Sequence, residues 1–257
     1  MTLRTLLLAG AAMTAIGTAA TAAETVKLGI AAEPYPPFTV PDAAGNWTGW
    51  EIEMAMAFCE AAELECVVTP VAWDGIIPAL TSGKIDMIVG SMSITEERKQ
   101  VIDFSDKYYN TPTSVIAEQG SGIEPTNESL AGKTLGIQGS TIHENYAEKH
   151  FPDAEIKLYQ TQDEANQDLY AGRVDAVQAD SLALQAFLDS DEGKACCEMA
   201  GDVEPDVEIL GPGVGIGLRK EDDALEEKLN AAIAQVRADG TYDEISKKYF
   251  SFDIYGG

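Results

Sequence analysis

Basic side chains are scarce in this sequence. The 257 residues hold 17 Lys and Arg against 43 Asp and Glu, and the formal net charge is −26. A chain this acidic is repelled by phosphate backbones and by anionic lipid headgroups. The composition therefore argues against nucleic acid and anionic membrane surfaces as partners. It favours solubility first, and it is compatible with a cationic ligand.

Histidine is scarcer still, since only His143 and His150 occur. Neither stands near the cysteines at a spacing typical of metal ligands. The glycines of GPGVGIGL, at residues 211–218, do not form a GxGxxG motif that leads into a helix. We therefore expect no metal site, no cofactor and no enzyme active site.

Long apolar runs are confined to the start of the chain. Residues 1–23 hold Arg4, then a Leu- and Ala-rich stretch, then alanines at a typical cleavage position, which predicts a secretory signal peptide. No cysteine follows to accept a lipid, and no later run approaches ~20 apolar residues. The mature chain is expected to be a soluble periplasmic protein.

Cysteine is limited to four residues. Cys59 and Cys66 lie where a predicted helix ends and a strand begins, and an oxidising compartment favours a disulfide between them. Cys196 and Cys197 are adjacent, and neighbours pair only through a strained ring. The sequence leaves the oxidation state of that second pair open.

Two segments of the chain repeat one pattern. ALTSGKIDMIVGS at 79–91 and DLYAGRVDAVQAD at 168–180 share Leu, Gly, a basic residue, a β-branched residue and Asp at a constant offset of 89. In each, a helix ends at a glycine and an apolar strand follows. The repeat predicts two related α/β lobes with mainly parallel strands. The glycine-rich strand and two C-terminal helices that follow it are expected to return to the first lobe.

Polar residues follow the strand in both copies of the repeat. Ser91, Ser93 and Arg98 follow the first, and the offset of 89 places Asp180 opposite Ser91. Ligands of open α/β sheets bind at the carboxyl ends of the strands. An arginine suits a carboxylate and an aspartate suits an ammonium, so the pair predicts an amino acid ligand. The alternative for Ser93 is a capping box with Glu96.

Further candidates stand at equivalent junctions of the chain. The stretch QGSTIHE contributes Gln138, Ser140 and Thr141, for which helix capping is the alternative role. Tyr35 and Trp73 lie in turn-rich stretches and are candidates to flank the ligand side chain.

The order and spacing of several motifs resemble one family. The sequence is similar to the periplasmic amino-acid-binding proteins of ABC importers, solute-binding protein family 3, which include lysine/arginine/ornithine-, histidine- and glutamine-binding proteins. The resemblance covers nearly the whole mature chain. It is carried by YPPF at 35–38, GWEIEMA at 49–55, DGIIPALTSGKID at 74–86, SMSITEER at 91–98, GIQGST at 136–141 and AGRVDA at 171–176.

The resemblance implies a two-lobed α/β fold of the type II periplasmic binding protein class. Two hinge strands join the lobes, and the ligand lies in the interlobe cleft. We expect lobe 1 to comprise residues 24–111 and 213–257, and lobe 2 residues 112–212. The implied partners are a polar, cationic amino acid and a membrane permease, with the binding protein a monomer.

The resemblance also assigns roles to residues. Arg98 corresponds to the arginine that binds the α-carboxylate, assisted by Ser93 and Thr141, and Asp180 to the acid that binds the α-ammonium, beside Ser91. Tyr35 and Trp73 correspond to the aromatic pair, and Cys59 and Cys66 to a disulfide of the basic-amino-acid members. The full candidate set is Glu33, Tyr35, Trp73, Gly90, Ser91, Ser93, Arg98, Gln138, Ser140, Thr141 and Asp180.

One departure from the family pattern concerns specificity. Members selective for cationic side chains carry an acid three residues before the tyrosine, where this chain has Ala32 followed by Glu33. Glu33 either reaches the ligand through a shift of one residue or faces solvent. AWDGIIPAL is also similar to opine-binding relatives, and periplasmic cyclohexadienyl dehydratases resemble the same fold. An opine or such an enzyme activity is therefore the alternative function.

Overall fold

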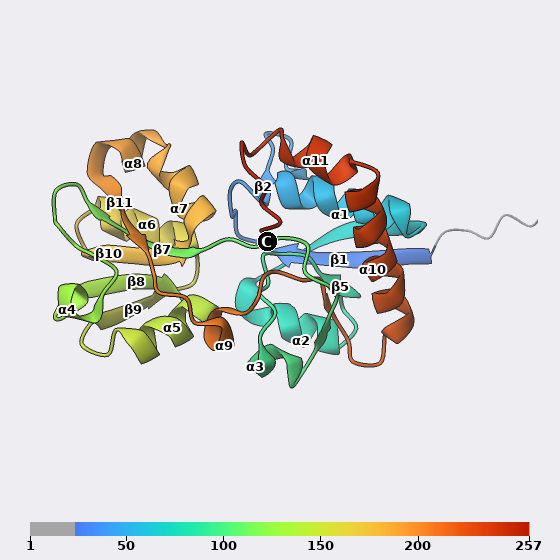
Figure 1. The fold of residues 1–257 in the computed structure, drawn as a ribbon, viewed down its shortest axis with the longest axis horizontal. Coiled ribbons are helices and arrows are strands. Elements are labelled where there is room, and N and C mark those ends of the chain that lie inside the picture. The colour runs from blue at the N-terminus through green and yellow to red at the C-terminus, as the bar shows by residue number, and fades with distance from the viewer. Residues whose placement is uncertain (1–23, 257) are drawn as a thin grey trace, which may run out of the picture.

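Two α/β lobes lie side by side along the long axis of the molecule (Figure 1). Our computed structural model describes residues 24–256, so the predicted signal peptide lies outside the described residues. One lobe holds the first strands and the last helices, and the other holds the middle of the chain. The two-lobed α/β fold predicted from the sequence is confirmed.

The first lobe is built on a five-stranded sheet of order β4-β1-β5-β12-β6. β1 (Glu24–Ala31) pairs in parallel with β4 (Leu64–Val71) and β5 (Met87–Ile88), while β12 (Gly217–Leu218) runs antiparallel to β5 and β6 (Asp103–Phe104). The remaining elements of this lobe are β2 (Val40–Pro41), β3 (Trp47–Thr48), α1 (Trp50–Ala61), a 3-10 turn at Trp73–Gly75, α2 (Ile76–Thr81), α3 (Glu96–Lys99), α10 (Asp223–Ala238) and α11 (Thr241–Ser246). The apolar faces of α1 and α10 pack together, so the C-terminal helices complete the core of the N-terminal lobe.

The second lobe has a sheet of order β11-β7-β10-β8-β9. β8 (Thr134–Gln138) pairs in parallel with β9 (Glu155–Tyr159) and β10 (Ala176–Asp180), and β7 (Thr113–Glu118) lies antiparallel between β10 and β11 (Cys197–Asp202). Its helices are α4 (Asn127–Leu130), α5 (Ile142–His150), α6 (Gln162–Tyr170), α7 (Ser181–Leu188), α8 (Asp191–Cys196) and α9 (Val207–Leu210). The strands β7, β8 and β10 are almost wholly buried, as expected for a sheet covered on both faces.

The predicted repeat is visible at the ends of α2 and α6. Gly83 and Gly172 follow these helices with φ of 72° and 66°, a left-handed conformation that glycine adopts at low cost. Each glycine leads into a loop and then a central strand, β5 in one lobe and β10 in the other. The residues that follow these two strands therefore come to equivalent places in the two lobes.

The chain crosses between the lobes twice, once from β6 into β7 and once from α9 into β12 (Figure 1). The second crossing runs through the predicted glycine strand, whose regular part is only two residues long. A Cβ atom at Gly211 would lie 2.1 Å from the Ile94 carbonyl oxygen, and one at Gly213 would lie 2.7 Å from that of Tyr109. The glycines thus permit a close backbone approach, but their positive φ interrupts the strand.

Two disulfides are present. Cys59, near the end of α1, pairs with Cys66 in β4, as predicted, and Cys196 pairs with its neighbour Cys197. Within residues 24–256, no helix is both long and apolar enough to cross a membrane, and no three or more His, Cys, Asp or Glu gather to hold a metal.

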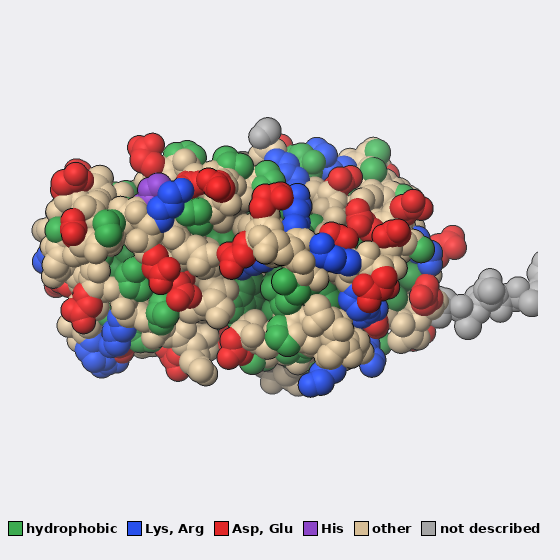
Figure 2. All heavy atoms as spheres, turned by 90° about the horizontal axis from the view of Figure 1, so that it is seen from below, with side chains coloured by type: hydrophobic (Ala, Val, Ile, Leu, Met, Phe, Trp, Pro, Cys, Tyr) green, Lys and Arg blue, Asp and Glu red, His purple; other side chains and the backbone are tan. Residues whose placement is uncertain are grey.

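Charged side chains of both signs cover the surface. On the face drawn in Figure 2, Asp and Glu are scattered over both lobes with Lys and Arg among them. This mixing is typical of a soluble surface and does not indicate a docking site for a polyanion.

Candidate functional site

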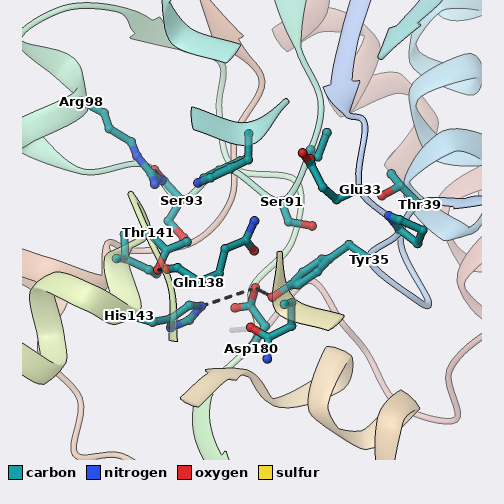
Figure 3. Close-up of a pocket in the computed structure, with 16 residues that line it drawn as sticks. Glu33, Tyr35, Thr39, Ser91, Ser93, Arg98, Gln138, Thr141, His143 and Asp180 are labelled. Atoms are coloured by element: carbon teal, nitrogen blue, oxygen red, sulfur yellow. Dashed lines mark hydrogen bonds and ion pairs between the residues drawn. The ribbon is translucent and has the colours of Figure 1, made fainter. Parts of the chain in front are cut away.

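A cavity between the lobes is lined by side chains from both (Figure 3). Ten of the eleven predicted site residues line it, and Ser140 is the one that does not. The lining residues are Ala31, Glu33, Pro34, Tyr35, Thr39, Trp73, Gly90, Ser91, Ser93, Arg98, Gln138, Thr141, Ile142, His143, Gln162 and Asp180.

Arg98 is placed by the short helix α3. The N-cap of α3 is Thr95, whose side chain accepts a hydrogen bond from the Arg98 backbone N–H at 3.2 Å. The alternative that Ser93 caps this helix is therefore wrong. Ser93 lies two residues before this N-cap and forms a β-bridge with Val214. That position leaves Ser93 on the wall of the cavity.

The Arg98 guanidinium has no acidic partner among the described residues. Its Nη1 donates to the Ser93 carbonyl at 3.0 Å, and its Cζ lies 5.5 Å from the ring centroid of Trp73. No carboxylate oxygen of residues 24–256 lies within 4.0 Å of its nitrogens. Burial lowers the pKa of Arg98 to about 10, so the group stays cationic at neutral pH. A half-buried cation of this kind is suited to bind an anion.

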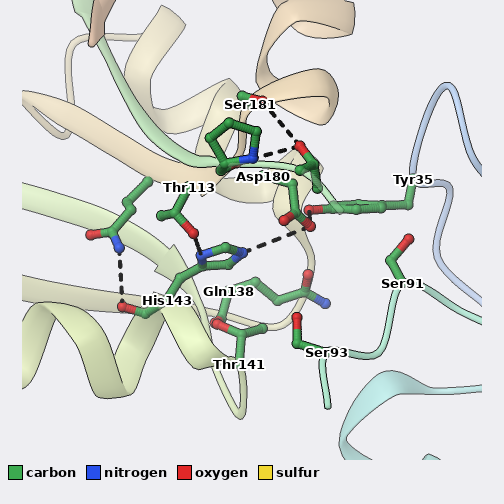
Figure 4. Close-up of polar contacts among 12 residues, drawn as sticks. Tyr35, Ser91, Ser93, Thr113, Gln138, Thr141, His143, Asp180 and Ser181 are labelled. Atoms are coloured by element: carbon green, nitrogen blue, oxygen red, sulfur yellow. Dashed lines mark hydrogen bonds and ion pairs between the residues drawn. The ribbon is translucent and has the colours of Figure 1, made fainter. Parts of the chain in front are cut away.

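Asp180 stands at the end of β10, where α7 begins, and it is buried. Its Oδ2 accepts a hydrogen bond from the Tyr35 hydroxyl at 2.7 Å and lies 3.8 Å from His143 Nε2 (Figure 4). Burial, followed by the charge of Asp180, raises the pKa of Tyr35 well above its ordinary value, so Tyr35 remains a neutral donor. Figure 3 shows Asp180 and Arg98 on different walls of the cavity, with Ser93, Gln138 and Thr141 between them.

Glu33 faces the same cavity from the loop after β1. Its Oε2 is buried and finds no hydrogen-bond partner within residues 24–256. A buried carboxylate oxygen without a donor is costly, and a ligand cation would remove that cost. Of the two alternatives left by the sequence, solvent exposure of Glu33 does not fit this buried oxygen.

Gln138 and Thr141 line the cavity from the second lobe. The Thr141 hydroxyl accepts from Glu144 N–H at 3.4 Å as the N-cap of α5 and donates to the Gln138 carbonyl at 2.7 Å. Thr141 therefore both caps its helix and lies at the cavity. The side chain of Gln138 donates to the Gln160 carbonyl at 3.1 Å.

Ser140 and Trp73 form a contact between the lobes. Trp73 Nε1 donates to the Ser140 carbonyl at 3.1 Å, in a hollow that adjoins the main cavity and shares Glu33 with it. The Ser140 backbone N–H donates to Glu144 at 2.6 Å and is thereby already occupied.

Several lining residues were not predicted, among them Thr39, Ile142, His143 and Gln162. Two of them had a usable signal in the sequence. His143 stands in the QGSTIHE stretch, two residues after Thr141, and Gln162 is the residue that the repeat offset of 89 pairs with Trp73. Thr39 had no such signal, because its place depends on how the loop after β1 folds back.

Known proteins share both the sequence and the fold. The chain is 42% identical over 234 residues to the L-arginine-binding protein of Pseudomonas aeruginosa, covering 90% of each chain. It is 41% identical over 244 residues to the histidine-binding periplasmic protein of Salmonella typhimurium, covering 93% of this chain and 94% of that one.

Solved structures of similar fold are known as well. An ancestral arginine-binding protein bound to arginine is similar with a TM-score of 0.81 and 34% identity, covering 90% of this chain and 100% of the other. The ancestral amino acid-binding protein AncCDT-1, a precursor of cyclohexadienyl dehydratase, is similar with a TM-score of 0.76 and 30% identity, covering 88% and 96%.

The family assignment rests on nearly all of the described residues. The profile of the bacterial extracellular solute-binding proteins, family 3, matches residues 26–252, which span both lobes and the cavity between them. This chain belongs to the bacterial extracellular solute-binding proteins, family 3.

Proposed function

We propose that this protein captures a cationic amino acid in the interlobe cavity and delivers it to the permease of an ABC importer. The observation that carries the proposal is the pair of unmatched charges at one cavity. Within the described part of the chain, Arg98 has no acidic partner, and Glu33 has a buried oxygen without a donor. With Asp180 as the third charge, the cavity complements one anionic and two cationic groups.

Each charge then has a partner on the ligand. Arg98 binds the α-carboxylate, assisted by Ser93 and by the backbone N–H of Thr141, whose hydroxyl already donates to the Gln138 carbonyl. Asp180 binds the α-ammonium beside Ser91, and the Tyr35 hydroxyl gives up part of its bond to Asp180 when the ammonium arrives. Glu33 receives the cationic end of the side chain, while the rings of Tyr35 and Trp73 flank the aliphatic part. Gly90 and Gln138 complete the walls, and Ser140 acts on closure through its carbonyl.

Names of relatives support the cationic class. The two relatives described above are named for arginine and histidine, and a related structure holds arginine. Delivery to a permease and a periplasmic location accord with the family. For this chain we propose export through cleavage near Ala23, and a monomer in solution. N-terminal sequencing of the exported protein and light scattering of the purified protein test these two points.

Isothermal titration calorimetry tests the ligand assignment. The protein is titrated with L-arginine, L-lysine, L-ornithine, L-histidine, L-glutamine and octopine, and a cationic amino acid is expected to bind most tightly. Arg98→Ala should weaken that binding by more than about 30-fold, since one member of a buried charge pair is lost. Lys99→Ala is the matched control, because Lys99 is the exposed neighbour paired with Glu96. Equal affinity of Arg98→Ala and the parent protein would contradict the site.

We propose binding rather than catalysis. The likeness to a precursor of a cyclohexadienyl dehydratase makes that activity the one to test. Incubation with arogenate or prephenate, followed by ultraviolet absorbance of an aromatic product, is expected to show no turnover. Product formation that is lost in Asp180→Asn would instead support an enzyme.

A further inference from the structure

A buried carboxylate lies directly behind the cavity wall. Glu51 is the second residue of α1, and its side chain is fully buried. It does not line the cavity and has no part in the ligand scheme above. No Lys, Arg or His nitrogen of residues 24–256 lies within 4.0 Å of its carboxylate. A buried charge without a counter-charge destabilises a fold unless hydrogen bonds compensate for its burial.

Those hydrogen bonds converge on one residue of the cavity wall. The Ser91 backbone N–H donates to both carboxylate oxygens of Glu51, at 2.8 and 3.0 Å, and the Ser91 hydroxyl donates to Oε2 at 3.2 Å. The Tyr108 hydroxyl donates to Oε1 from the other side. Ser91 itself lines the cavity. Glu51 thus acts on the cavity through Ser91.

The backbone of Ser91 needs such support. Its φ is 54°, a left-handed conformation that is unfavourable for residues other than glycine. The conformation directs its N–H inward to Glu51. The three bonds between these two residues therefore hold Ser91 in place after β5.

The hydrogen bond from the Ser91 hydroxyl to Glu51 also decides whether this hydroxyl can donate to a ligand or only accept from it. A serine hydroxyl has one proton and two lone pairs. When the proton is donated to a carboxylate, only the lone pairs are left for the cavity. A hydroxyl in this state accepts hydrogen bonds from a ligand and donates none.

We propose that Glu51 is a positioning residue that selects for ligand N–H donors. It holds Ser91 in its left-handed conformation and takes the proton of the Ser91 hydroxyl, so that Ser91 accepts a hydrogen bond from the α-ammonium of the amino acid. The inference rests on the proposed function. Glu51 does not touch the ligand, and the bond at Ser91 runs from the α-ammonium to the hydroxyl oxygen.

Glu51→Gln is the direct test. Glutamine keeps the shape but carries no charge, and its amide donates as well as accepts hydrogen bonds. The Ser91 hydroxyl is then free to donate its proton to other groups. The dissociation constant for L-arginine, measured by calorimetry at pH 8, where Glu51 is mainly ionised, should rise about tenfold or more. Glu53→Gln is the matched control from the same helix, because Glu53 bonds Lys248 and Tyr249. It should bind within about twofold of the parent protein.

A double-mutant cycle separates positioning from a purely structural role. Ser91→Ala keeps the backbone N–H and removes the hydroxyl, and it should weaken arginine binding by about tenfold. In the Ser91→Ala background, the effect of Glu51→Gln should shrink to about threefold or less. Equal factors in the two backgrounds would make Glu51 merely structural and overturn the proposal.

Three further outcomes keep the test decisive. If Glu51→Gln does not fold by circular dichroism, Ser91→Ala alone decides, and binding within about twofold of the parent overturns the proposal. If the parent protein binds arginine but Glu51→Gln binds it equally well, only this inference fails. If the parent protein binds no amino acid, the proposed function fails first.

Discussion

At the scale of single residues, the charged groups that mark the site are those without a partner of opposite charge. On the surface, Asp168 pairs with Arg173 and Lys157 and accepts a hydrogen bond from the Tyr159 hydroxyl, and these contacts lower its pKa well below the ordinary value. Such exposed pairs are screened by solvent and contribute little. Arg98 and Glu33 are more enclosed and lack such partners among residues 24–256. A ligand therefore gains the most binding free energy by pairing with Arg98 and Glu33.

Glu33 should therefore control the choice between cationic and neutral side chains. Glu33→Gln removes the charge and keeps the size, so the preference for L-arginine over its neutral analogue L-citrulline should fall about tenfold or more. Glu65→Gln, at an exposed position of β4, serves as the control and should keep the preference. Calorimetric titration of both ligands measures the ratio. An unchanged ratio in Glu33→Gln would place the side-chain cation elsewhere.

Glu51 should make the stability of the ligand-free protein depend on pH. Burial raises the pKa of Glu51 from 4.5 to about 7, against the bonds from Tyr108 and Ser91, and the charge of Asp180 adds to the rise. The fold thus favours the protonated form more than the unfolded chain does, and the ionised form that accepts the Ser91 bonds predominates above about pH 7. The stabilisation is complete below pH 4.5 and is lost as the pH rises through about 7.

The size of this effect follows from the shift in pKa. Relative to Glu51→Gln, the free energy of unfolding of the parent protein should fall by about 3 kcal/mol between pH 4.5 and pH 8. Urea denaturation of both proteins across that range measures the difference. A difference that is the same at every pH would show that Glu51 keeps one charge state throughout.

At the scale of elements, the disulfide between Cys59 and Cys66 joins α1 to β4 over a separation of seven residues. Closing a chain loop of this length stabilises the fold by about 2 to 3 kcal/mol through the unfolded state. Cys59→Ala with Cys66→Ala should lower the free energy of unfolding by that amount, as measured by urea denaturation. Cys196→Ala with Cys197→Ala is the control, and it should cost less because neighbours close no chain loop. Equal losses would contradict this account.

Elements that depend on local patterns could be predicted from the sequence. Gly83 and Gly172 end their helices by a local rule, and the constant offset of 89 then places Ser91 and Asp180 after equivalent strands. Local rules also misled, since Thr95 and not Ser93 caps α3. Two hydroxyl residues near one helix start give the same signal, and the bond from the Arg98 N–H to the Thr95 hydroxyl decides between them.

Contacts between distant residues could not be predicted in this way. Glu51 stands 40 residues before Ser91, and Tyr35 stands 145 residues before Asp180. Both contacts depend on the order of the strands and on the closure of the lobes, and the spacing of residues within one short segment determines neither. The motifs named Arg98 and Asp180 as site residues, while the residues that position them had to come from the structure.

At the scale of the whole molecule, direct bonds link the two lobes across the cleft. Three hydrogen bonds do this: Tyr35 donates to Asp180, Trp73 to the Ser140 carbonyl, and Asn145 on α5 to Glu97 on α3. The first two lie at the cavity, whereas the third lies on the exposed rim. Closure therefore has its own contacts in addition to those that the ligand supplies.

The rim contact gives a test of closure that leaves the cavity intact. Asn145 Nδ2 donates to Glu97 Oε2 at 2.9 Å, a bond that exists only when the lobes are together. Asn145→Ala should speed arginine dissociation by about two- to tenfold and leave the association rate within about twofold, because the open form meets the ligand first.

Stopped-flow fluorescence of the tryptophans measures both rates, since Trp73 lines the cavity. Asn127→Ala is the matched control, because Asn127 makes its bond to Asp153 within the second lobe. An unchanged dissociation rate in Asn145→Ala would mean that the ligand alone holds the lobes together. A slower association rate would mean that Glu97 and Asn145 guide the ligand in, and not that they hold the closed form.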